Sequence, residues 1–343
     1  MRTSSKLIIA EIKDDFSNSD SSLLFSSAEW IKVLKLSYNF KFLQVKNQET
    51  GHFLVFALIE NAFETKLLSI PFSDYSGEKD LREKEALELI EQLRKKYPGY
   101  PVYFKSRLKD KEALRQSAEL LKRGVYHRVE IMGRSYSELK SLQSSSFKRG
   151  VKKAKKEDIE VGISHKKQDL EIFYELYFQL RTDKFNIIPQ PFSFFQKIFD
   201  QFIAKDKGFM LTASYFKETV AVILILEYKN CWYYKFGASS KGYLNHRPNN
   251  LIFSKLIEMA CNKGIEEIDL GFSGAGESYK GLRRFKRDMA GVEYPIHIFK
   301  WAGDKSMERD KEVLGKLTNE LIEQDLNIKS IDRFSEILYP YFA

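Results

Sequence analysis

One stretch, from Cys231 to Gly291, most constrains what this chain can fold into. It opens with a short aromatic run, Cys231–Phe236, which predicts a strand that ends at the turn-forming residues 237–240. Residues 247–250, Arg-Pro-Asn-Asn, predict the start of a helix because proline is favoured in a first helical turn, and Lys263-Gly264 predicts its end. The apolar residues that share one face of this helix are Ile252, Phe253, Leu256, Ile257 and Ala260.

A second strand, Ile265–Leu270, is expected to follow this helix and to run into a loop that contains Gly271, Gly274 and Gly276. Five cations then fall within eight residues that include no acid, namely Lys280, Arg283, Arg284, Lys286 and Arg287. A helix N-terminus offers unpaired N–H groups and the positive end of a dipole, and clustered cations bind phosphates. The pattern favours phosphate binding beside a strand end. The alternative is a glycine-rich surface loop followed by a solvated basic helix.

The length and the charge of the chain narrow its class. A chain of 343 residues is longer than one typical core and predicts two domains. The net charge of +9 and the pI of about 9.1 favour an anionic partner, which could be nucleic acid, a nucleotide cofactor, a phospholipid headgroup or a pyrophosphate-bearing substrate. Charge alone does not choose among these partners.

The cysteines and histidines indicate neither a disulfide framework nor a metal site. Cys231 and Cys261 have no metal-ligand spacing, and the five histidines are scattered, so we expect no metal. The apolar run near the N-terminus is too short for a signal peptide, and the longest apolar run, Val220–Leu226, is too short to span a membrane. We therefore expect a soluble cytoplasmic protein and leave peripheral membrane contact open.

Elsewhere the pattern predicts mixed helices and strands. In the first half we expect a helix over Asp110–Lys122, followed by a strand over Val125–Ile131. A pair of short helices is expected over Ser137–Lys156, and its segment Phe147–Lys156 carries six cations and no acid. This basic segment could contact phosphate or RNA, but a solvated helix face with apolar residues turned inward is favoured. A charged helix is expected over Ser306–Gln324.

An ordered set of motifs resembles the FemAB-like branch of the GNAT acyltransferase superfamily, which includes peptidoglycan-bridge aminoacyltransferases and acetyltransferase-like domains. The motifs are Tyr234-x-x-Gly237-Ala238-Ser239, Pro248-Asn249-x-Leu251, Asp269-x-Gly271, Gly281 and Phe285-Lys286. The resemblance is firm between about Ser146 and Gly291. It implies an α/β (α+β) fold with two GNAT-like domains in tandem, each a mixed central sheet flanked by helices. The implied domains are residues 1–140 and 141–300, with a helical tail, 301–343, that packs back on the first domain.

The resemblance also implies which residues act. Lys286 is implied to serve the substrate phosphate or the transferring group, and Tyr234 is a candidate proton carrier. Arg283 and Arg284 could each hold a phosphate in two hydrogen bonds. Arg181 ends an apolar helix where the family carries an arginine that faces the cleft, although it could equally interact with a helix dipole. The full set of implied substrate- or phosphate-binding residues is Arg181, Lys235, Arg247, Asn249, Asn250, Lys280, Arg283 and Arg284.

One departure from the superfamily concerns the loop that binds acetyl-CoA. That loop is usually rich in glycine, whereas residues 245–250 of this chain contain none. The activated donor is therefore left open between acyl-CoA and aminoacyl-tRNA, and tRNA is a candidate partner. The resemblance implies an N-acyltransferase that moves an acyl or aminoacyl group to an amine of a cell-envelope precursor or amino sugar. The alternative is a non-catalytic module on the same fold that binds nucleic acid or another anionic polymer.

Overall fold

The computed structural model describes residues 7–13, 21–77, 79–108, 111–304, 312–324 and 326–343. The chain forms two compact units, and each unit is discontinuous in sequence. Unit 1 comprises Met1–Gly124, Pro295–Leu314 and Leu338–Ala343, and unit 2 comprises Val125–Tyr294 and Gly315–Ile337. The sequence had suggested a division at residue 140, whereas the chain passes from unit 1 to unit 2 at Gly124.

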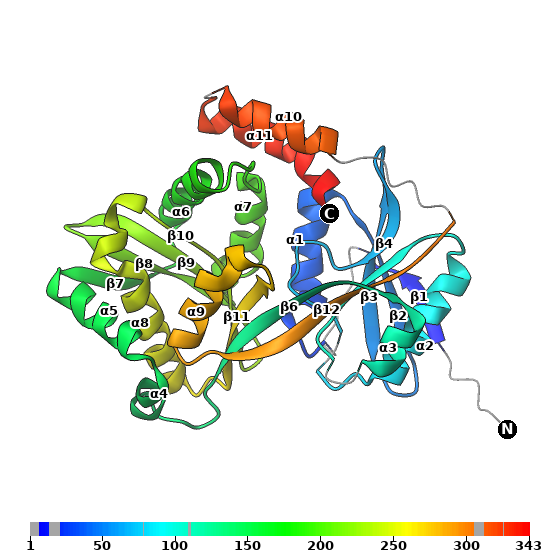
Figure 1. Ribbon diagram of the computed structural model, residues 1–343, viewed down its shortest axis with the longest axis horizontal. Coiled ribbons are helices and arrows are strands. Elements are labelled where there is room, and N and C mark those ends of the chain that lie inside the picture. Colours follow the sequence, from blue (N-terminus) through cyan, green and yellow to red (C-terminus); the bar gives the residue numbers. More distant parts are fainter. Residues whose placement is uncertain (1–6, 14–20, 78, 109–110, 305–311, 325) are drawn as a thin grey trace. The chain divides into compact units, whose positions relative to one another are not determined.

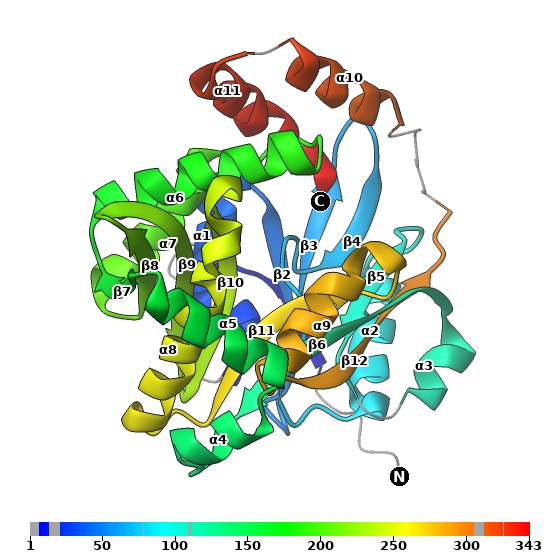
Figure 2. The same ribbon diagram turned by 60° about the vertical axis from the view of Figure 1, so that its left-hand side comes forward.

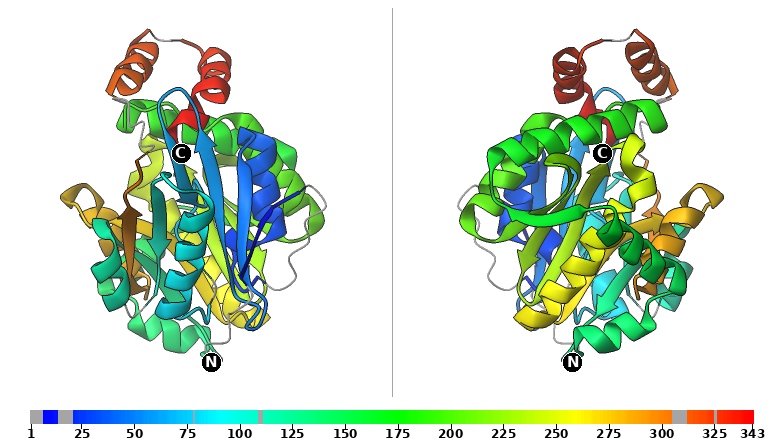
Figure 3. Two further views of the ribbon diagram at one scale, coloured as in Figure 1. Left: turned by 90° about the vertical axis from the view of Figure 1, so that its right-hand side faces the viewer. Right: turned by 90° about the vertical axis from the view of Figure 1, so that its left-hand side faces the viewer.

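Unit 1 contains strands in the order β1-β2-β3-β4-β5-β12. The β4–β5 pair is parallel, and the other neighbours in this order are antiparallel. The strands are β1 (Leu7–Glu11), β2 (Lys41–Asn47), β3 (Phe53–Glu60), β4 (Thr65–Ser69), β5 (Val102–Ser106) and β12 (Val292–Trp301). The helices are α1 (Ala28–Tyr38), α2 (Glu83–Lys96) and α3 (Glu112–Ser117). Helix α2 packs across β1, β2 and β3, as the left view of Figure 3 shows.

Besides the start of β12, the strands that lie wholly or partly in unit 2 follow the order β6-β11-β10-β9-β8-β7, and β6 enters this unit at Val125. The β10–β11 pair is parallel, and the pairs from β10 through β9 and β8 to β7 are antiparallel. The strands are β6 (Glu119–Glu130), β7 (Ile159–Ser164), β8 (Gly208–Tyr215), β9 (Glu218–Tyr228), β10 (Cys231–Ser239) and β11 (Glu267–Gly274). The helices are α4 (Tyr136–Leu142), α5 (Ser145–Lys156), α6 (Lys167–Gln179), α7 (Phe192–Gln201), α8 (Pro248–Lys263) and α9 (Lys280–Asp288).

Helices cover both faces of the sheet in unit 2. Helices α6 and α7 lie on one face and α5 and α8 on the other (Figure 1), and α5 runs beside α8 in Figure 2. The core on the α8 side joins alternate strand residues to α8, for example Leu211, Ile223 and Trp232 with Ile252 and Leu256. This two-sided arrangement explains why β9 is buried along most of its length. The expected fold class, a mixed sheet flanked by helices in each half, is confirmed.

Local sequence sets the ends of the helices that matter below. Pro248 opens α8 in its first turn, and Gly264 ends it in the left-handed region with a φ of 68°, as the sequence predicted. Ser144 begins α5 by accepting a 3.0 Å hydrogen bond from the Phe147 N–H. Within α5, Phe147 and Ala154 are buried while most of the cations are exposed. The expected inward-facing apolar side of this helix is therefore confirmed.

Two expectations about single elements are wrong. Helix α3 ends at Ser117, and residues 119–122 belong to β6, because pairing within the sheet outweighs the helical pattern of this segment. Residues 237–239 do not turn but continue β10, paired with Ile223, Val222 and Ala221 of β9. The structure also contains β7, which pairs with β8 and which the sequence pattern had not indicated.

The C-terminal segment is helical where it is described. Its helices are α10 (Glu312–Glu323) and α11 (Ile328–Leu338), while residues 306–311 of the expected charged helix lie outside the described residues. Tyr339 packs with Tyr38 and Phe72 of unit 1. In unit 2, Asp332 of α11 accepts hydrogen bonds from the Tyr174 hydroxyl at 2.6 Å and from the Phe192 N–H at 2.7 Å. The segment after residue 311 therefore contributes residues to both units.

Candidate active site

The central feature of the site is the place where β10 and β11 part. The two parallel strands are paired from Cys231 with Glu267 to Tyr233 with Asp269, and the described residues form no further pair between them. Beyond this point β10 continues to pair with β9, after an irregularity between Tyr234 and Phe236. Backbone groups of β10 and β11 are thus released from pairing with each other. An opening between two parallel strands can admit an extended ligand that bonds to the strand edges.

Tyr234 lies at this parting. Its ring meets the Phe253 ring of α8 edge to face, with 4.9 Å between the centroids. A Cβ atom on Gly237 would come within 2.6 Å of the Tyr234 hydroxyl oxygen, so glycine is required there for the tyrosine to fit. Burial raises the pKa of Tyr234 to about 12, and its hydroxyl has no hydrogen-bond partner among the described residues. Tyr234 is therefore a protonated hydroxyl that is available to a ligand.

Helix α8 begins at Pro248, five residues before Phe253, and no side chain of the described residues caps its N-terminus. Its first turn therefore offers a positive dipole end to an anion. Arg247 occupies the N-cap position with a φ of 61°, in the left-handed region that glycine adopts most easily. This chain thus forms the turn into α8 without the glycine that the superfamily loop usually supplies, and it places a cation there instead.

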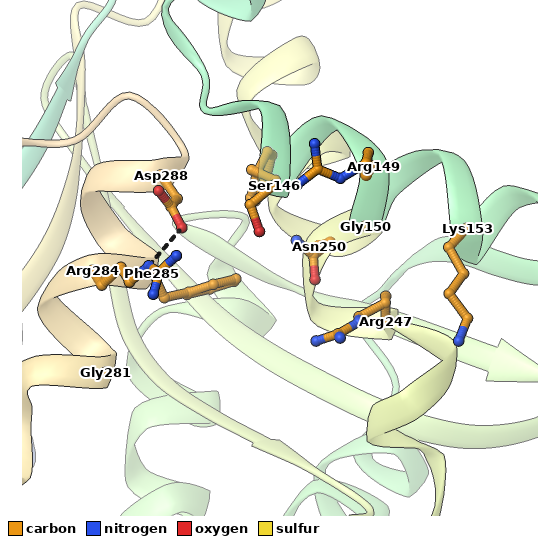
Figure 4. Close-up of a pocket in the computed structure, with 11 residues that line it drawn as sticks. Ser146, Arg149, Gly150, Lys153, Arg247, Asn250, Gly281, Arg284, Phe285 and Asp288 are labelled. Carbon is orange, nitrogen blue, oxygen red and sulfur yellow. Dashed lines mark ion pairs between the residues drawn. The ribbon is translucent and has the colours of Figure 1, made fainter.

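A pocket of about 430 Å³ lies at this helix start. It is bordered by α5, by the first turn of α8 and by α9. Its lining residues are Ser146, Phe147, Arg149, Gly150, Lys153, Arg247, Asn250, Gly281, Arg284, Phe285 and Asp288. In Figure 4 the Lys153 side chain extends down from α5 and the Arg247 guanidinium extends away from it, below Asn250, with Arg284 beside Asp288 on α9. Four cations against one carboxylate make this pocket suited to a phosphate.

A close helix contact shapes the pocket. A Cβ atom on Gly150 of α5 would come within 2.6 Å of Asn250 Nδ2 and 2.7 Å of its Cγ. Glycine at this position lets α5 approach the first turn of α8, and it leaves the Asn250 amide in the pocket wall (Figure 4). Neighbouring Asn249 instead turns to β10, where its Nδ2 donates a 3.1 Å hydrogen bond to the Ser239 hydroxyl. Asn249 thus fixes the helix start to the parted strand.

Lys286 differs from its expected environment. Its side chain is 3% exposed, and its ammonium donates to Gly271 O at 2.9 Å, Phe272 O at 3.1 Å and Ser273 Oγ at 3.0 Å. The motif resemblance implies a lysine that serves the substrate phosphate or the transferring group, whereas the Lys286 ammonium is buried against the residues that follow Asp269. The ammonium holds the end of β11, where β11 no longer pairs with β10.

The other predicted site residues divide between the pocket and other positions. Arg247, Asn250 and Arg284 line the pocket. Exposed Lys280 pairs with Glu277 at 3.4 Å, and half-buried Arg283 does not line the pocket. Lys235 lies over the Phe236 ring, and Arg181 lies over Tyr177 and Phe185 with a buried Nε that has no hydrogen-bond partner among the described residues.

Among the pocket residues that were not proposed as site residues from the sequence are the two cations Arg149 and Lys153. Their signal was the basic segment Phe147–Lys156, for which the sequence favours a solvated face. That interpretation describes most of the helix, but the side of α5 that carries Arg149 and Lys153 faces the start of α8. Residue spacing in a sequence predicts which side chains share a face of a helix, but it does not predict which other element that face contacts.

The comparisons with known proteins agree with this geometry. Residues 142–287 match the family model described as an acetyltransferase (GNAT) domain. The match includes α5, β10, α8 and β11, so the resemblance to GNAT acyltransferases and the expected transferase class are confirmed for this part of the chain. No curated protein matches the chain.

Solved structures extend the likeness to most of the chain. A crystal structure of FemX is 14% identical, covers 90% of this chain and 100% of its own, and has a TM-score of 0.62. The C-terminal domain of a putative lysylphosphatidylglycerol synthetase from Agrobacterium fabrum is 12% identical, with coverages of 86% and 91% and a TM-score of 0.54. L-PGS from Bacillus licheniformis is 17% identical, with coverages of 80% and 87% and a TM-score of 0.50. At these identities the likeness establishes the fold.

Two further properties concern only the described residues. None of their helices combines the length and the hydrophobicity needed to cross a membrane. Their histidine, cysteine and acidic side chains form no group of three that could hold a metal ion.

The backbone of Arg247 leads to a first prediction. Replacing Arg247 with glycine is expected to leave unit 2 more stable than replacing it with alanine, by about 1 kcal/mol, because only glycine adopts a positive φ without strain. Both variants lack the guanidinium, so the comparison isolates the backbone. Urea unfolding of the two proteins measures the difference. An alanine variant as stable as the glycine variant would mean that Arg247 does not adopt this conformation.

Proposed function

We propose that this chain is an N-acyltransferase that moves an acyl or aminoacyl group from an activated, phosphate-bearing donor to an amine. The observation that carries the proposal is the parting of β10 from β11 beside the uncapped, cation-lined start of α8. The parted strands offer backbone groups to an extended donor, and the pocket offers charge to its phosphates. The match of residues 142–287 to a GNAT domain supports the same reaction class.

The donor is oriented by three features in this proposal. Its phosphate lies against the α8 N-terminus and bonds to Lys153 and Arg247, which both line the pocket. Its chain runs between β10 and β11 so that the reactive carbonyl lies near Tyr234. Lys286 acts as a positioning residue, because its ammonium fixes the Gly271 and Phe272 carbonyls at the end of β11. Holding two reactants in this way removes much of the entropic cost of the reaction.

Tyr234 moves the proton in the proposed step. The amine nitrogen bonds to the carbonyl carbon, and the bond from that carbon to the donor sulfur or oxygen breaks. The leaving group takes the Tyr234 proton, and the resulting tyrosinate takes the proton that the new amide nitrogen must lose. A hydroxyl with a pKa of about 12 stays protonated at neutral pH, and its proton transfer is matched more closely to the alkoxide that leaves an ester donor than to a less basic thiolate.

The proposed acceptor is an amine of a cell-envelope precursor or amino sugar. The name of one similar structure, a putative lysylphosphatidylglycerol synthetase, supports the cell-envelope context, while the amine acceptor rests on the match to a GNAT domain. Acyl-CoA and aminoacyl-tRNA are the two proposed donors. The cationic pocket is compatible with either donor, because both carry phosphates.

Turnover with a donor panel tests this function. The purified chain is incubated with acetyl-CoA, longer acyl-CoA species or aminoacyl-tRNA and with amino sugar nucleotides or aminophospholipids, and mass spectrometry detects the amide product. In the double variant Lys153→Gln and Arg247→Gln, the donor KM is expected to rise about tenfold or more, because each charged hydrogen bond contributes roughly 1.5–3 kcal/mol. The control is Lys84→Gln, an exposed lysine on α2. An unchanged donor KM in the double variant would contradict the phosphate assignment.

A further inference from the structure

A second pocket, of about 720 Å³, lies on the other side of α5. It is formed by α4, α5, β7 and the middle of α8, and it shares no lining residue with the pocket at the α8 N-terminus. Its volume is within the range of small-molecule sites in proteins. Six lysines and one glutamate are its charged lining residues. The lysines are Lys140, Lys148, Lys152, Lys155, Lys156 and Lys255.

The charge of this pocket is largely unneutralised. Glu258, its single acid, pairs with Lys255 at 2.9 Å, and the Lys148 ammonium donates a 3.0 Å hydrogen bond to Ser141 O of α4. Four of the lysines follow helical spacing on α5, at 148, 152, 155 and 156, and therefore project from one side of that helix. Like charges gathered on one side repel one another, and a bound anion relieves that repulsion.

A buried donor without a partner gives an independent indication of a ligand. Gln143, which also lines the pocket, is 4% exposed, and its Nε2 makes no hydrogen bond to any described residue. A buried N–H group without an acceptor costs free energy, so such groups are rare in folded proteins. A ligand oxygen in the pocket would supply the acceptor.

A hydrogen bond between two helices holds the wall of this pocket in place. The Tyr136 hydroxyl of α4 and the Ser254 hydroxyl of α8 lie 2.6 Å apart in a hydrogen bond, which fixes α4 against α8. The apolar lining residues are Val151, Ile159, Val161 and Leu251. Lysines together with aliphatic side chains suit a ligand that carries phosphate groups next to an apolar or planar part.

We propose that this pocket is a second anion-binding site, which takes a phosphate-bearing small molecule with an apolar or planar portion. The lysines of α5 bind its phosphates, the Gln143 amide donates to one of its oxygens, and the aliphatic side chains contact the remainder. The site is separate from the proposed donor site, so α5 lies between two anion-binding pockets. The phosphate could belong to a free nucleotide or to a phospholipid headgroup, and the experiment distinguishes these sources.

Isothermal titration calorimetry, which measures the binding of ADP and of inorganic tripolyphosphate to the full chain, tests the proposal. Lys152→Gln with Lys156→Gln is expected to weaken binding at this pocket about tenfold or more, since it removes two charged contacts. Lys153→Gln with Arg247→Gln is the matched pair, because Lys153 lies on the same helix but faces the other pocket. If only Lys153→Gln with Arg247→Gln loses binding, this inference is overturned and the proposed donor site stands. If only Lys152→Gln with Lys156→Gln loses binding, the second anion site stands and phosphate binding at the donor site is contradicted.

Gln143→Leu separates ligand binding from folding. Leucine removes the unpaired donor at similar volume, so the empty protein is expected to melt about 2–4 °C higher while ADP and tripolyphosphate bind more weakly. A residue with only a structural role would not change the two quantities in opposite directions. Lower stability with unchanged binding would overturn the assignment of Gln143.

Co-sedimentation with phosphatidylglycerol vesicles identifies the source of the phosphate. Vesicle binding that the Lys152 and Lys156 variant abolishes would assign the site to a headgroup, and nucleotide binding without vesicle binding would assign it to a free ligand. If neither ADP, nor tripolyphosphate, nor vesicles depend on these lysines, the pocket is not an anion site.

Discussion

Replacing Lys286 with methionine is expected to lower the free energy of unfolding by about 3 kcal/mol. The ammonium donates to three acceptors at the end of β11, and hydrogen bonds to charged groups contribute about 1.5–3 kcal/mol each. Methionine carries no charge, so the variant no longer has the free-energy cost of burying an ammonium, and this gain offsets part of the lost hydrogen-bond energy. Methionine fills much of the same space but leaves the Gly271 and Phe272 carbonyls without this donor.

Urea unfolding of Lys286→Met and Arg287→Met measures this effect against a matched control. Arg287 is the next residue on α9, and its exposed guanidinium lies 3.2 Å from Glu293 Oε2, so its loss should cost less than about 1 kcal/mol. Equal stability of the two variants would show that the Lys286 ammonium is not buried as described. Such a result would restore the lysine that serves the substrate phosphate or the transferring group, as the motif resemblance implies.

Acidification between about pH 6.5 and pH 4 is expected to destabilise unit 2 by about 3 kcal/mol through His127. This histidine is fully buried, and burial, followed by the charge of Lys286, lowers its pKa from 6.5 to about 4. The unfolded chain takes up the proton near pH 6.5 and the folded protein only near pH 4. The stability from neutral His127 is therefore fully present above about pH 6.5 and is lost as the pH falls toward 4.

Urea unfolding at pH 7 and pH 4.5 should therefore give a smaller difference for His127→Gln than for the parent chain. Glutamine cannot titrate, and it can still bond to Glu293, whose Oε1 lies 3.0 Å from His127 Nε2. The control is His165→Gln, because His165 is exposed. His297 in unit 1 also has a pKa lowered to about 4, chiefly by burial, so part of the pH dependence should survive. A parent chain and His127 variant with the same pH dependence would contradict the assignment.

The elements that carry the site could be predicted where the signals are local. Pro248 and Gly264 determine the ends of α8 because each acts through its own backbone, whereas the pair of helices expected over Ser137–Lys156 was predicted without the start of α5 at the Ser144 cap. The order of strand, helix and strand from Cys231 onward was visible for the same reason. The motif resemblance then identified the domain that residues 142–287 match.

The features that give the site its chemistry depend on contacts between residues that are far apart in the sequence. The parting of β10 from β11 depends on which strand residues pair, and those residues are more than thirty positions apart. The burial of Lys286 depends on carbonyls of β11 that a basic segment does not reveal. The contact of Gly150 with Asn250 joins two helices about 100 residues apart in sequence. Local patterns cannot specify such pairs, because many packings satisfy the same periodicity.

The most direct test of the proposed acyl-transfer site is a crystal structure of the chain with an unreactive analogue of whichever donor supports turnover. The account predicts a donor phosphate within hydrogen-bond distance of Lys153 and Arg247 at the start of α8. It also predicts the acyl carbonyl between β10 and β11, next to the Tyr234 hydroxyl. A donor bound elsewhere, with β10 and β11 empty beyond Tyr233 and Asp269, would contradict it.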